Sequence, residues 1–308
     1  MNATSTTPDR SPLDQPIGII GLGVMGSTIA ARLHRTGHRV IAYDANPNQI
    51  AKVQQDSAAS IEAAQSPQEV ASQTSIIILS LNTAAIVRSV AQNVFSVNAN
   101  DALIIDMSSI DPGTTRELAD EARGKNIGWV DSPLSGGAPK ASTGELTLML
   151  GGTPEAVARA RTVLQYLATR TTHCGPSGSG QAVKAINQLI VGSAFTALSE
   201  AAALTRSQNL EPEAVLDALT GGRADSPVFQ EFFLKFAKAD PEPTGRISNM
   251  LKDLETVLEL GRQTTTPLPM SSAITELHRW LVSHGLGNAD SASMGVFYDA
   301  ELDDGRWL

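Results

Sequence analysis

Residues 17–26 read Ile-Gly-Ile-Ile-Gly-Leu-Gly-Val-Met-Gly, and this stretch decides the fold. The apolar run at residues 17–20 predicts a buried strand, and apolar residues at helical spacing then continue as far as Gly37. Between strand and helix lies the GxGxxG pattern of dinucleotide-binding domains. Its residues are Gly21, Leu22, Gly23, Val24, Met25 and Gly26. The stretch therefore predicts a helix N-terminus whose N–H groups and dipole favour the phosphates of a dinucleotide.

Each glycine of this pattern has its own physical use. Gly21 allows a tight turn, Gly23 lets a pyrophosphate approach the backbone, and Gly26 allows close packing of the helix on the strand. Asp44 lies 21 residues after Gly23, at the end of the next predicted strand, Val40–Tyr43. A carboxylate there accepts hydrogen bonds from the ribose hydroxyls of NAD and repels the 2′-phosphate of NADP. Since no arginine follows Asp44 closely, the sequence predicts NAD in preference to NADP; the alternative is an exposed turn aspartate.

The strand signal recurs along the first half of the chain. Apolar runs at residues 76–79 and 102–106 are separated by segments of helical pattern, and further runs follow at residues 129–131 and 146–150. Strands that alternate with helices are typical of a parallel, doubly wound sheet. After about residue 178 the strand signal ends, and residues 181–208 contain no helix breaker except one glycine. They predict a single helix roughly 40 Å long.

The predicted fold class is an α/β Rossmann domain joined by this long interdomain helix to an all-α C-terminal domain. We assign residues 16–178 to the first domain and residues 179–308 to the second. The polar residues 1–15, rich in Ser, Thr and Pro, are interpreted as a flexible tail.

Composition excludes several other classes. Of the 308 residues 42% are hydrophobic, as in globular proteins, and a net charge of −9 works against binding to DNA or acidic membranes. We therefore expect no nucleic-acid partner and no membrane partner. The sequence shows no signal peptide and no long apolar run, which predicts a cytoplasmic location. Cys174, the single cysteine, excludes a disulfide within the chain, and the scattered histidines lack metal-ligand spacing, so no metal is predicted.

Three later segments carry polar residues that the fold class does not require. They are residues 131–141, DSPLSGGAPKA, residues 178–188, GSGQAVKAINQ, and residues 252–254, KDL. Taken with the opening motif, and in this order, they resemble the β-hydroxyacid dehydrogenase family, which includes 3-hydroxyisobutyrate, tartronate semialdehyde and threonate dehydrogenases or reductases. Residues 104–109 are similar to a further cofactor segment of that family. The resemblance extends from Ile17 to about Tyr298, and it implies an NAD-dependent oxidoreductase that acts on a small anionic hydroxy acid.

The resemblance implies that Lys184 is the catalytic acid/base, although a lysine on a long helix is most often a solvated surface residue. Oxidation of an alcohol removes a hydride from carbon and a proton from oxygen, and a lysine whose pKa lies near the working pH can take that proton. The substrate-binding residues that the resemblance implies are Ser135, Gly136, Gly137, Asn187 and Gln188. The first three offer a hydroxyl and unobstructed N–H groups that can hold a carboxylate. The two amides follow the lysine at a spacing that brings them close to its side of the helix.

Two features of the resemblance bear on substrate and cofactor. Many family members have Asn-Asn where this sequence has Asn187-Gln188. The Asn-Gln pair, with its longer second side chain, resembles the threonate dehydrogenase branch of the family. The residues that the resemblance places near the cofactor, besides the glycine motif and Asp44, are Leu81, Asn82, Ser109 and Lys252. Taken alone, Asn82 and Ser109 could be loop-capping residues, and Lys252 could belong to a surface ion pair.

Other functions stay open at this point. The related 6-phosphogluconate dehydrogenases share the fold and the lysine but carry His-Asn after it, and imine reductases usually replace the lysine. A non-catalytic dinucleotide-binding module would have lost it. The presence of Lys184 favours a hydroxyacid dehydrogenase over the last two. The long helix predicts a homodimer or homotetramer. A further set of residues at helical spacing predicts either core or subunit interface: Phe229, Phe232, Phe233 and Phe236.

Overall fold

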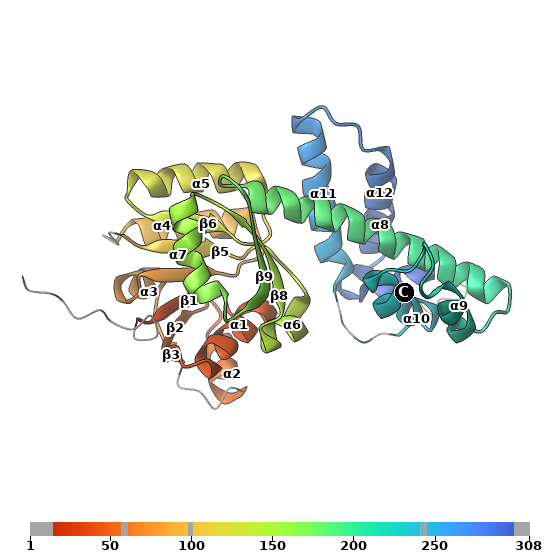
Figure 1. Ribbon diagram of the computed structural model, residues 1–308, viewed down its shortest axis with the longest axis horizontal. Coiled ribbons are helices and arrows are strands. Elements are labelled where there is room, and N and C mark those ends of the chain that lie inside the picture. Colours follow the sequence, from red (N-terminus) through yellow and green to blue (C-terminus); the bar gives the residue numbers. More distant parts are fainter. Residues whose placement is uncertain (1–14, 57–60, 98–100, 241, 243–244, 299–308) are drawn as a thin grey trace, which may run out of the picture. The chain divides into compact units, whose positions relative to one another are not determined.

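The computed structural model describes residues 15–56, 61–97, 101–240, 242 and 245–298. The chain divides into two compact units, Met1–Lys184 and Ala185–Leu308. The division falls inside helix α8 (Ser179–Ser207), a few residues after the predicted domain boundary (Figure 1). The predicted flexible tail lies outside the described residues, apart from Gln15.

Within the described part of the first unit, nine strands form one sheet in the order β3-β2-β1-β4-β5-β6-β8-β7, with β9 paired to β8. The strands β3 to β6 of this series are parallel in the order typical of a Rossmann fold, which confirms the predicted fold class. The strand bounds are β1 Ile17–Ile20, β2 Val40–Tyr43, β3 Glu62–Ala63, β4 Ile76–Leu79, β5 Leu103–Asp106, β6 Gly128–Asp131, β7 Leu134–Ser135, β8 Leu146–Gly151 and β9 Ala168–Gly175.

Helices cover both faces of this sheet, which is why its central strands are continuous apolar runs rather than alternating ones. Ile19 and Ile78 pack with helices α1 and α7 on one face, whereas Ile20 and Ile77 pack with helices α3, α4 and α5 on the other. The helix bounds in this unit are α1 Val24–Arg35, α2 Pro47–Asp56, α3 Pro67–Gln73, α4 Ala84–Phe95, α5 Pro112–Gly124, α6 Gly137–Thr143 and α7 Pro154–Leu164.

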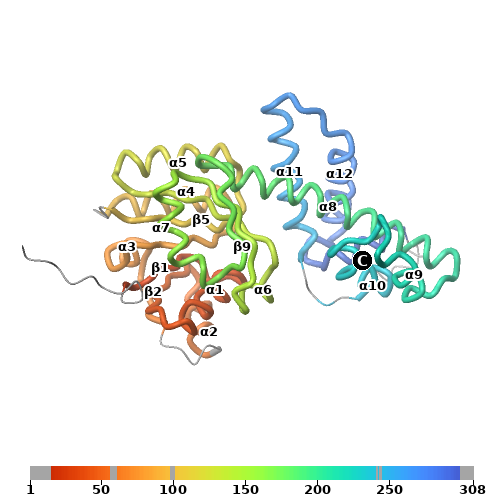
Figure 2. The backbone as a smooth tube through the Cα atoms, in the orientation of Figure 1, coloured from red at the N-terminus to blue at the C-terminus, as the bar shows by residue number. Residues whose placement is uncertain are grey.

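Three strands carry too little apolar signal to be found from the sequence. β3 and β7 have only two residues each, and β7 lies within the segment that we interpreted as an anion-binding loop. In β9 most side chains are partly or fully exposed, so no apolar run marks it. The backbone trace shows β8 and β9 side by side before the chain enters α8 (Figure 2).

The described residues of the second unit are helical, as predicted, apart from one isolated bridge between Arg246 and Asp290. Phe229, Phe233 and Phe236 of α10 are buried in its core, which confirms the core interpretation of this cluster. The bounds of its remaining helices are α9 Pro212–Leu219, α10 Pro227–Ala237, α11 Ile247–Gln263, α12 Pro269–Ser283, and the short 3-10 helices η2 Leu286–Asn288 and η3 Ser291–Tyr298. Across the described ranges, every helix is too short or too polar to span a lipid bilayer.

Candidate functional site

The glycine turn after β1 has the geometry that each predicted use requires. Gly21 adopts a φ of 95°, and a Cβ there would lie 2.3 Å from the carbonyl oxygen of Ser80. A Cβ on Gly26 would lie 1.9 Å from the carbonyl oxygen of Gly21, so only glycine lets α1 start this close to β1. At Gly23, in contrast, a Cβ would meet nothing within 4 Å. The turn is therefore tightly packed at Gly21 and Gly26 and open at Gly23, as the approach of a pyrophosphate requires.

The N-terminus of α1 has no side-chain partner of its own. Gly23 is the N-cap residue and makes no side-chain cap hydrogen bond, and the first turn contains no acidic residue. Val24, the first helical residue, is 75% exposed, and Met25 is partly buried against the core. These N–H groups and the helix dipole suit an anion from outside the protein.

Asp44 lies beside this turn at the carboxyl end of β2. Its carboxylate accepts a hydrogen bond of 2.6 Å from the N–H of Leu22 and one of 2.7 Å from the N–H of Asn46. The carboxylate is thus fixed against the glycine turn itself, although it stays half-exposed. This is the placement that a ribose-binding acid needs.

The loops after β4 and β5 reach the same edge of the sheet, because these strands neighbour β1 and run parallel to it. The N–H of Leu81 donates to the Oγ of Ser108 over 3.0 Å, so the two loops are joined. Asn82 is exposed and Ser109 half-buried. The structure therefore brings Leu81, Asn82 and Ser109 to the edge that holds the glycine turn and Asp44.

The start of α8 is held by Asp131, which the sequence analysis did not single out as a functional residue. Its two carboxylate oxygens accept hydrogen bonds from the N–H groups of Gly178 (2.8 Å) and Gln181 (3.0 Å). A Cβ on Gly180 would lie 2.3 Å from the carbonyl oxygen of Met149, so α8 begins directly against the sheet. Burial raises the pKa of Asp131, and the hydrogen bonds from Gly178 and Gln181 act in the opposite direction.

Asp106 lies next to Asp131 in the register of β5 and β6. It is fully buried, and its Oδ1 accepts from the N–H of Ser108 over 3.0 Å. The pKa of Asp106 is raised to about 7, chiefly by burial and in smaller part by the neighbouring Asp131, against the lowering effect of hydrogen bonds from Ser108. The only local signal for either aspartate is its position at the carboxyl end of a parallel strand, where such folds place functional groups.

The predicted anion-binding segment leads from β7 into α6. Ser135 pairs with Thr147 of β8, and Gly136 and Gly137 follow with φ angles of 123° and 64°. Both glycines are exposed, and at these positive φ angles the backbone turns in a way that glycine adopts readily. Lys184 is half-buried on α8, the last residue of the first unit.

The remaining predicted residues belong to the second unit. The Nδ2 of Asn187 donates to the Oε1 of Gln188 over 2.9 Å, and the Nε2 of Gln188 donates to Asp253 over 2.6 Å. The other oxygen of Asp253 lies 3.3 Å from the Nζ of Lys252. These four side chains form one polar cluster between α8 and α11. Asp253 was quoted in the KDL motif but given no role in the sequence analysis.

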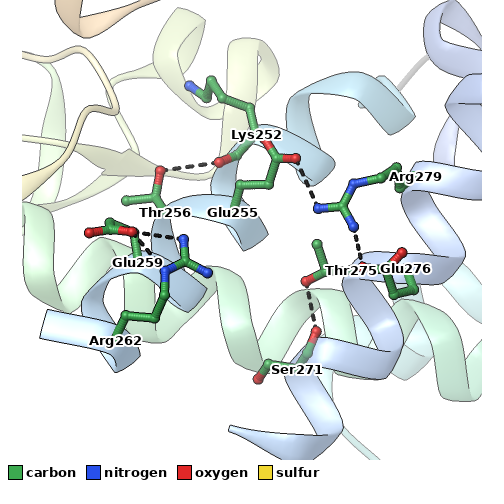
Figure 3. A network of polar contacts seen from close by, with 9 residues as sticks. All are labelled: Lys252, Glu255, Thr256, Glu259, Arg262, Ser271, Thr275, Glu276 and Arg279. Atoms are coloured by element: carbon green, nitrogen blue, oxygen red, sulfur yellow. Dashed lines mark hydrogen bonds and ion pairs between the residues drawn. The ribbon is translucent and has the colours of Figure 1, made fainter. Parts of the chain in front are cut away.

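A separate polar network joins α11 to α12 near this cluster (Figure 3). Arg279 of α12 donates to Glu255 over 3.2 Å and also pairs with Glu276. The side chain of Lys252 points away from these residues in Figure 3. The lysine ammonium is therefore directed to Asp253 rather than to this surface network. Among the described residues, no group of three or more His, Cys, Asp or Glu side chains could hold a metal ion.

Two family profiles together cover nearly the whole chain. Residues 16–175 match the NAD-binding domain of 6-phosphogluconate dehydrogenase. Residues 178–297 match a domain described as NAD-binding of NADP-dependent 3-hydroxyisobutyrate dehydrogenase. The two matches meet at the beginning of α8.

Similar proteins match along their full length. The chain is 33% identical to 2-(hydroxymethyl)glutarate dehydrogenase of Eubacterium barkeri, over 90% of this chain and 93% of that protein. It is 31% identical to L-threonate dehydrogenase of Cupriavidus necator, over 94% of this chain and 98% of that protein. Among solved structures, 3-hydroxyisobutyrate dehydrogenase of Mycobacterium tuberculosis with L-serine is 25% identical, with a TM-score of 0.84 over 93% of this chain and 99% of that one.

Proposed function

Since the chain belongs to the β-hydroxyacid dehydrogenase family, we propose that it oxidises a small anionic β-hydroxy acid, or reduces the matching semialdehyde or keto acid, with Lys184 as acid/base. The observation that carries this proposal is the presence of Lys184 on the turn of α8 that Asp131 anchors to the nucleotide-binding sheet.

The chemistry follows from what the side chains can do. The dinucleotide, when bound at the glycine turn, supplies the hydride acceptor for alcohol oxidation. Lys184 in its neutral form takes the hydroxyl proton, and in its protonated form returns it in the reverse direction. Ser135, Gly136 and Gly137 hold the substrate anion through the serine hydroxyl and backbone N–H groups.

We propose NAD rather than NADP as the preferred cofactor. The support is the fixed carboxylate of Asp44, which the Leu22 N–H holds beside the glycine turn. A 2′-phosphate would bring negative charge against this carboxylate, and residues 45–48 offer no arginine to compensate. Kinetics with both cofactors test this; equal kcat/KM values for NAD and NADP would remove the preference.

For the substrate we propose a polyhydroxy acid of the L-threonate type. Support comes from Gln188, whose side chain is one methylene longer than that of asparagine. Its amide is hydrogen-bonded to Asn187 and Asp253. The relative that acts on L-threonate spans almost the whole chain. A homodimer or homotetramer in the cytoplasm completes the proposal; exposed Ile186 and Ile190 on α8 support a subunit contact.

A substrate panel with NAD and NADP tests the proposal as a whole. It should include L-threonate, 2-(hydroxymethyl)glutarate, 3-hydroxyisobutyrate, glycerate, L-serine and phenylserine. We expect NAD-dependent oxidation of at least one hydroxy acid. A parallel assay for reduction of a cyclic imine with NADPH tests the alternative activity. Reduction of the imine alone would favour the imine reductase alternative. Tight NAD binding without turnover of any candidate would favour a non-catalytic module.

A further inference from the structure

We propose that Gln181 is a positioning residue, which sets the nicotinamide-side loop at Ser109 in register with the turn of α8 that carries Lys184. The inference rests on the proposed function, because it assigns a purpose to the distance between a cofactor loop and a catalytic lysine. It concerns only contacts within the first unit of the chain. Gln181 belongs to the motif at residues 178–188, but the family resemblance implied no function for this residue.

The amide of Gln181 holds the backbone on both sides of Ser109. Its Nε2 donates to the carbonyl oxygen of Ser108 over 2.8 Å, and its Oε1 accepts from the N–H of Ile110 over 3.3 Å. The side chain is 2% exposed, so water does not replace either hydrogen bond. A primary amide donates from one atom and accepts at the other, so one side chain serves both backbone groups. The Ser109 loop is thereby bound to α8 across more than seventy residues of sequence.

The same residue is tied to the sheet through its backbone. The N–H of Gln181 donates to Asp131, and Gly180 lies too close to the sheet for any side chain. The loop that Gln181 holds is in turn joined to the loop after β4, since Ser108 accepts from the N–H of Leu81. Gln181 therefore links the end of β5, through its side chain, to the end of β6, through its backbone N–H, and Ser108 extends this link to the loop after β4.

Lys184 follows Gln181 by three residues, so the two side chains leave α8 on neighbouring positions of one side. Any shift of this turn along the sheet would leave the carbonyl of Ser108 and the N–H of Ile110 buried without partners, which is costly. Gln181 thus fixes the position of the Lys184 backbone relative to Ser109. Displacement of a reacting group by about 1 Å can slow an enzyme by about 100-fold, so this link matters for rate more than for affinity.

Two substitutions at Gln181 separate positioning from stability. Gln181→Met preserves length and shape but removes both hydrogen bonds. Gln181→Glu keeps the acceptor for Ile110, but can donate to Ser108 only while the carboxyl is protonated. Thr115→Val is the matched control, because Thr115 is also buried and its hydroxyl donates to the carbonyl oxygen of Asp111, the N-cap residue of its own helix α5.

We expect Gln181→Met to lower kcat by about 30–100-fold with little change in the substrate KM. The kcat of Gln181→Glu, as a ratio to that of the wild type at the same pH, should rise as the pH falls, because its protonated carboxyl can donate to Ser108. Protonation of the lysine base lowers the absolute kcat of both proteins and cancels in this ratio. Thr115→Val should lose stability but keep kcat within about twofold. Wild-type kcat in Gln181→Met, or an equal loss in Thr115→Val, would overturn the proposal. So would a Gln181→Glu variant whose kcat, taken as a ratio to that of the wild type at the same pH, does not rise as the pH falls.

A binding measurement decides the proposal even if no substrate is found. ADP-ribose lacks nicotinamide, so Gln181→Met should bind it like the wild type, within about twofold, while its affinity for NADH falls by about tenfold. Unchanged affinity for NADH, or an equal loss for both ligands, would contradict a role at the nicotinamide-side loop. Failure of the wild type to oxidise any hydroxy acid would refute the proposed function but would not alter this comparison.

Discussion

The glycine-containing turns that begin α1 and α8 differ in where the anion at the helix N-terminus comes from. At α1, Gly23 faces open space and no side chain caps the helix. At α8, the N–H groups of Gly178 and Gln181 are already bonded to the buried carboxylate of Asp131. Similar glycine spacing thus serves two purposes. The first turn is left open for a ligand, whereas the second is closed by the protein's own acid.

This difference separates binding from stability. Substitutions at the start of α1 should weaken cofactor binding and leave the free protein folded. Substitutions of Asp131 and Gly180, which fix the start of α8 to the sheet, should destabilise the protein before they affect a ligand. The following predictions test that separation.

Removal of Asp131 should have the largest effect on stability. Asp131→Ala leaves two buried N–H groups without acceptors, which we expect to cost about 3–5 kcal/mol of unfolding free energy. Asp131→Asn keeps one acceptor oxygen and should lose about half as much. Hydrogen exchange at residues 178–184, together with urea unfolding, measures both. Unchanged protection of these amides in Asp131→Ala would contradict the capping role.

The acids beneath α8 should also make stability depend on pH. The pKa of Asp106 is raised from 3.8 to about 7 in the folded chain, so the folded state binds more protons than the unfolded state between these values. Stability from this group is therefore complete below about pH 4 and is lost as the pH rises through 7. Between pH 5 and pH 8 the loss should be about 2–3 kcal/mol.

Asp106→Asn should flatten this dependence by the same amount in urea unfolding at each pH. Asp120→Asn is the control, since Asp120 is largely exposed in its pair with Arg123. A slope in Asp106→Asn equal to that of the wild type would exclude Asp106 as its source.

A pair of alanine substitutions compares the two turns directly. Gly180→Ala places a Cβ against the backbone of Met149 and should cost about 2 kcal/mol of stability. Gly23→Ala has room in the free protein and a backbone conformation that alanine adopts, so its stability should change by less than about 0.5 kcal/mol. Its affinity for NAD should nevertheless fall by about tenfold or more. Thermal unfolding measures the stability of each variant, and calorimetry measures its affinity for NAD. A large loss of stability in Gly23→Ala, or none in Gly180→Ala, would contradict our interpretation of the two turns.

The smallest expected change is one of cofactor preference. Asp44→Asn keeps an oxygen that can accept from Leu22 but removes the negative charge. The ratio of kcat/KM for NAD to that for NADP should fall by about tenfold, through a gain with NADP. Since Asp44 is half-exposed, the stability of the protein should change little. An unaltered ratio would show that another residue excludes the 2′-phosphate.

Most of the fold could be predicted from the sequence because the central strands are short apolar runs separated by segments of helical pattern. The predicted strands at residues 17–20, 40–43 and 76–79 have these bounds in the structure, and the predicted helix at 181–208 begins and ends within two residues of α8. β9 was missed, because most of its side chains are partly or fully exposed and no apolar run marks it; its position is defined by pairing with β8.

The site was less accessible to prediction for a different reason. Its glycine turn is a local pattern, and the structure gives Gly21, Gly23 and Gly26 the geometry expected of them. Asp131 meets the start of α8 across about fifty residues, and Gln181 meets Ser108 across more than seventy. Contacts of that range leave no trace in local spacing. They depend on which strand ends the sheet order brings together.

The most direct test of the account is the turnover of Lys184→Ala with the best hydroxy acid from the panel, measured beside its affinity for NADH. General acid/base catalysis by Lys184 predicts a kcat lower by about 10²–10⁴-fold. The dissociation constant for NADH should stay within about twofold, because the glycine turn and Asp44 are untouched. A kcat close to that of the wild type would contradict the assignment of Lys184 as the acid/base.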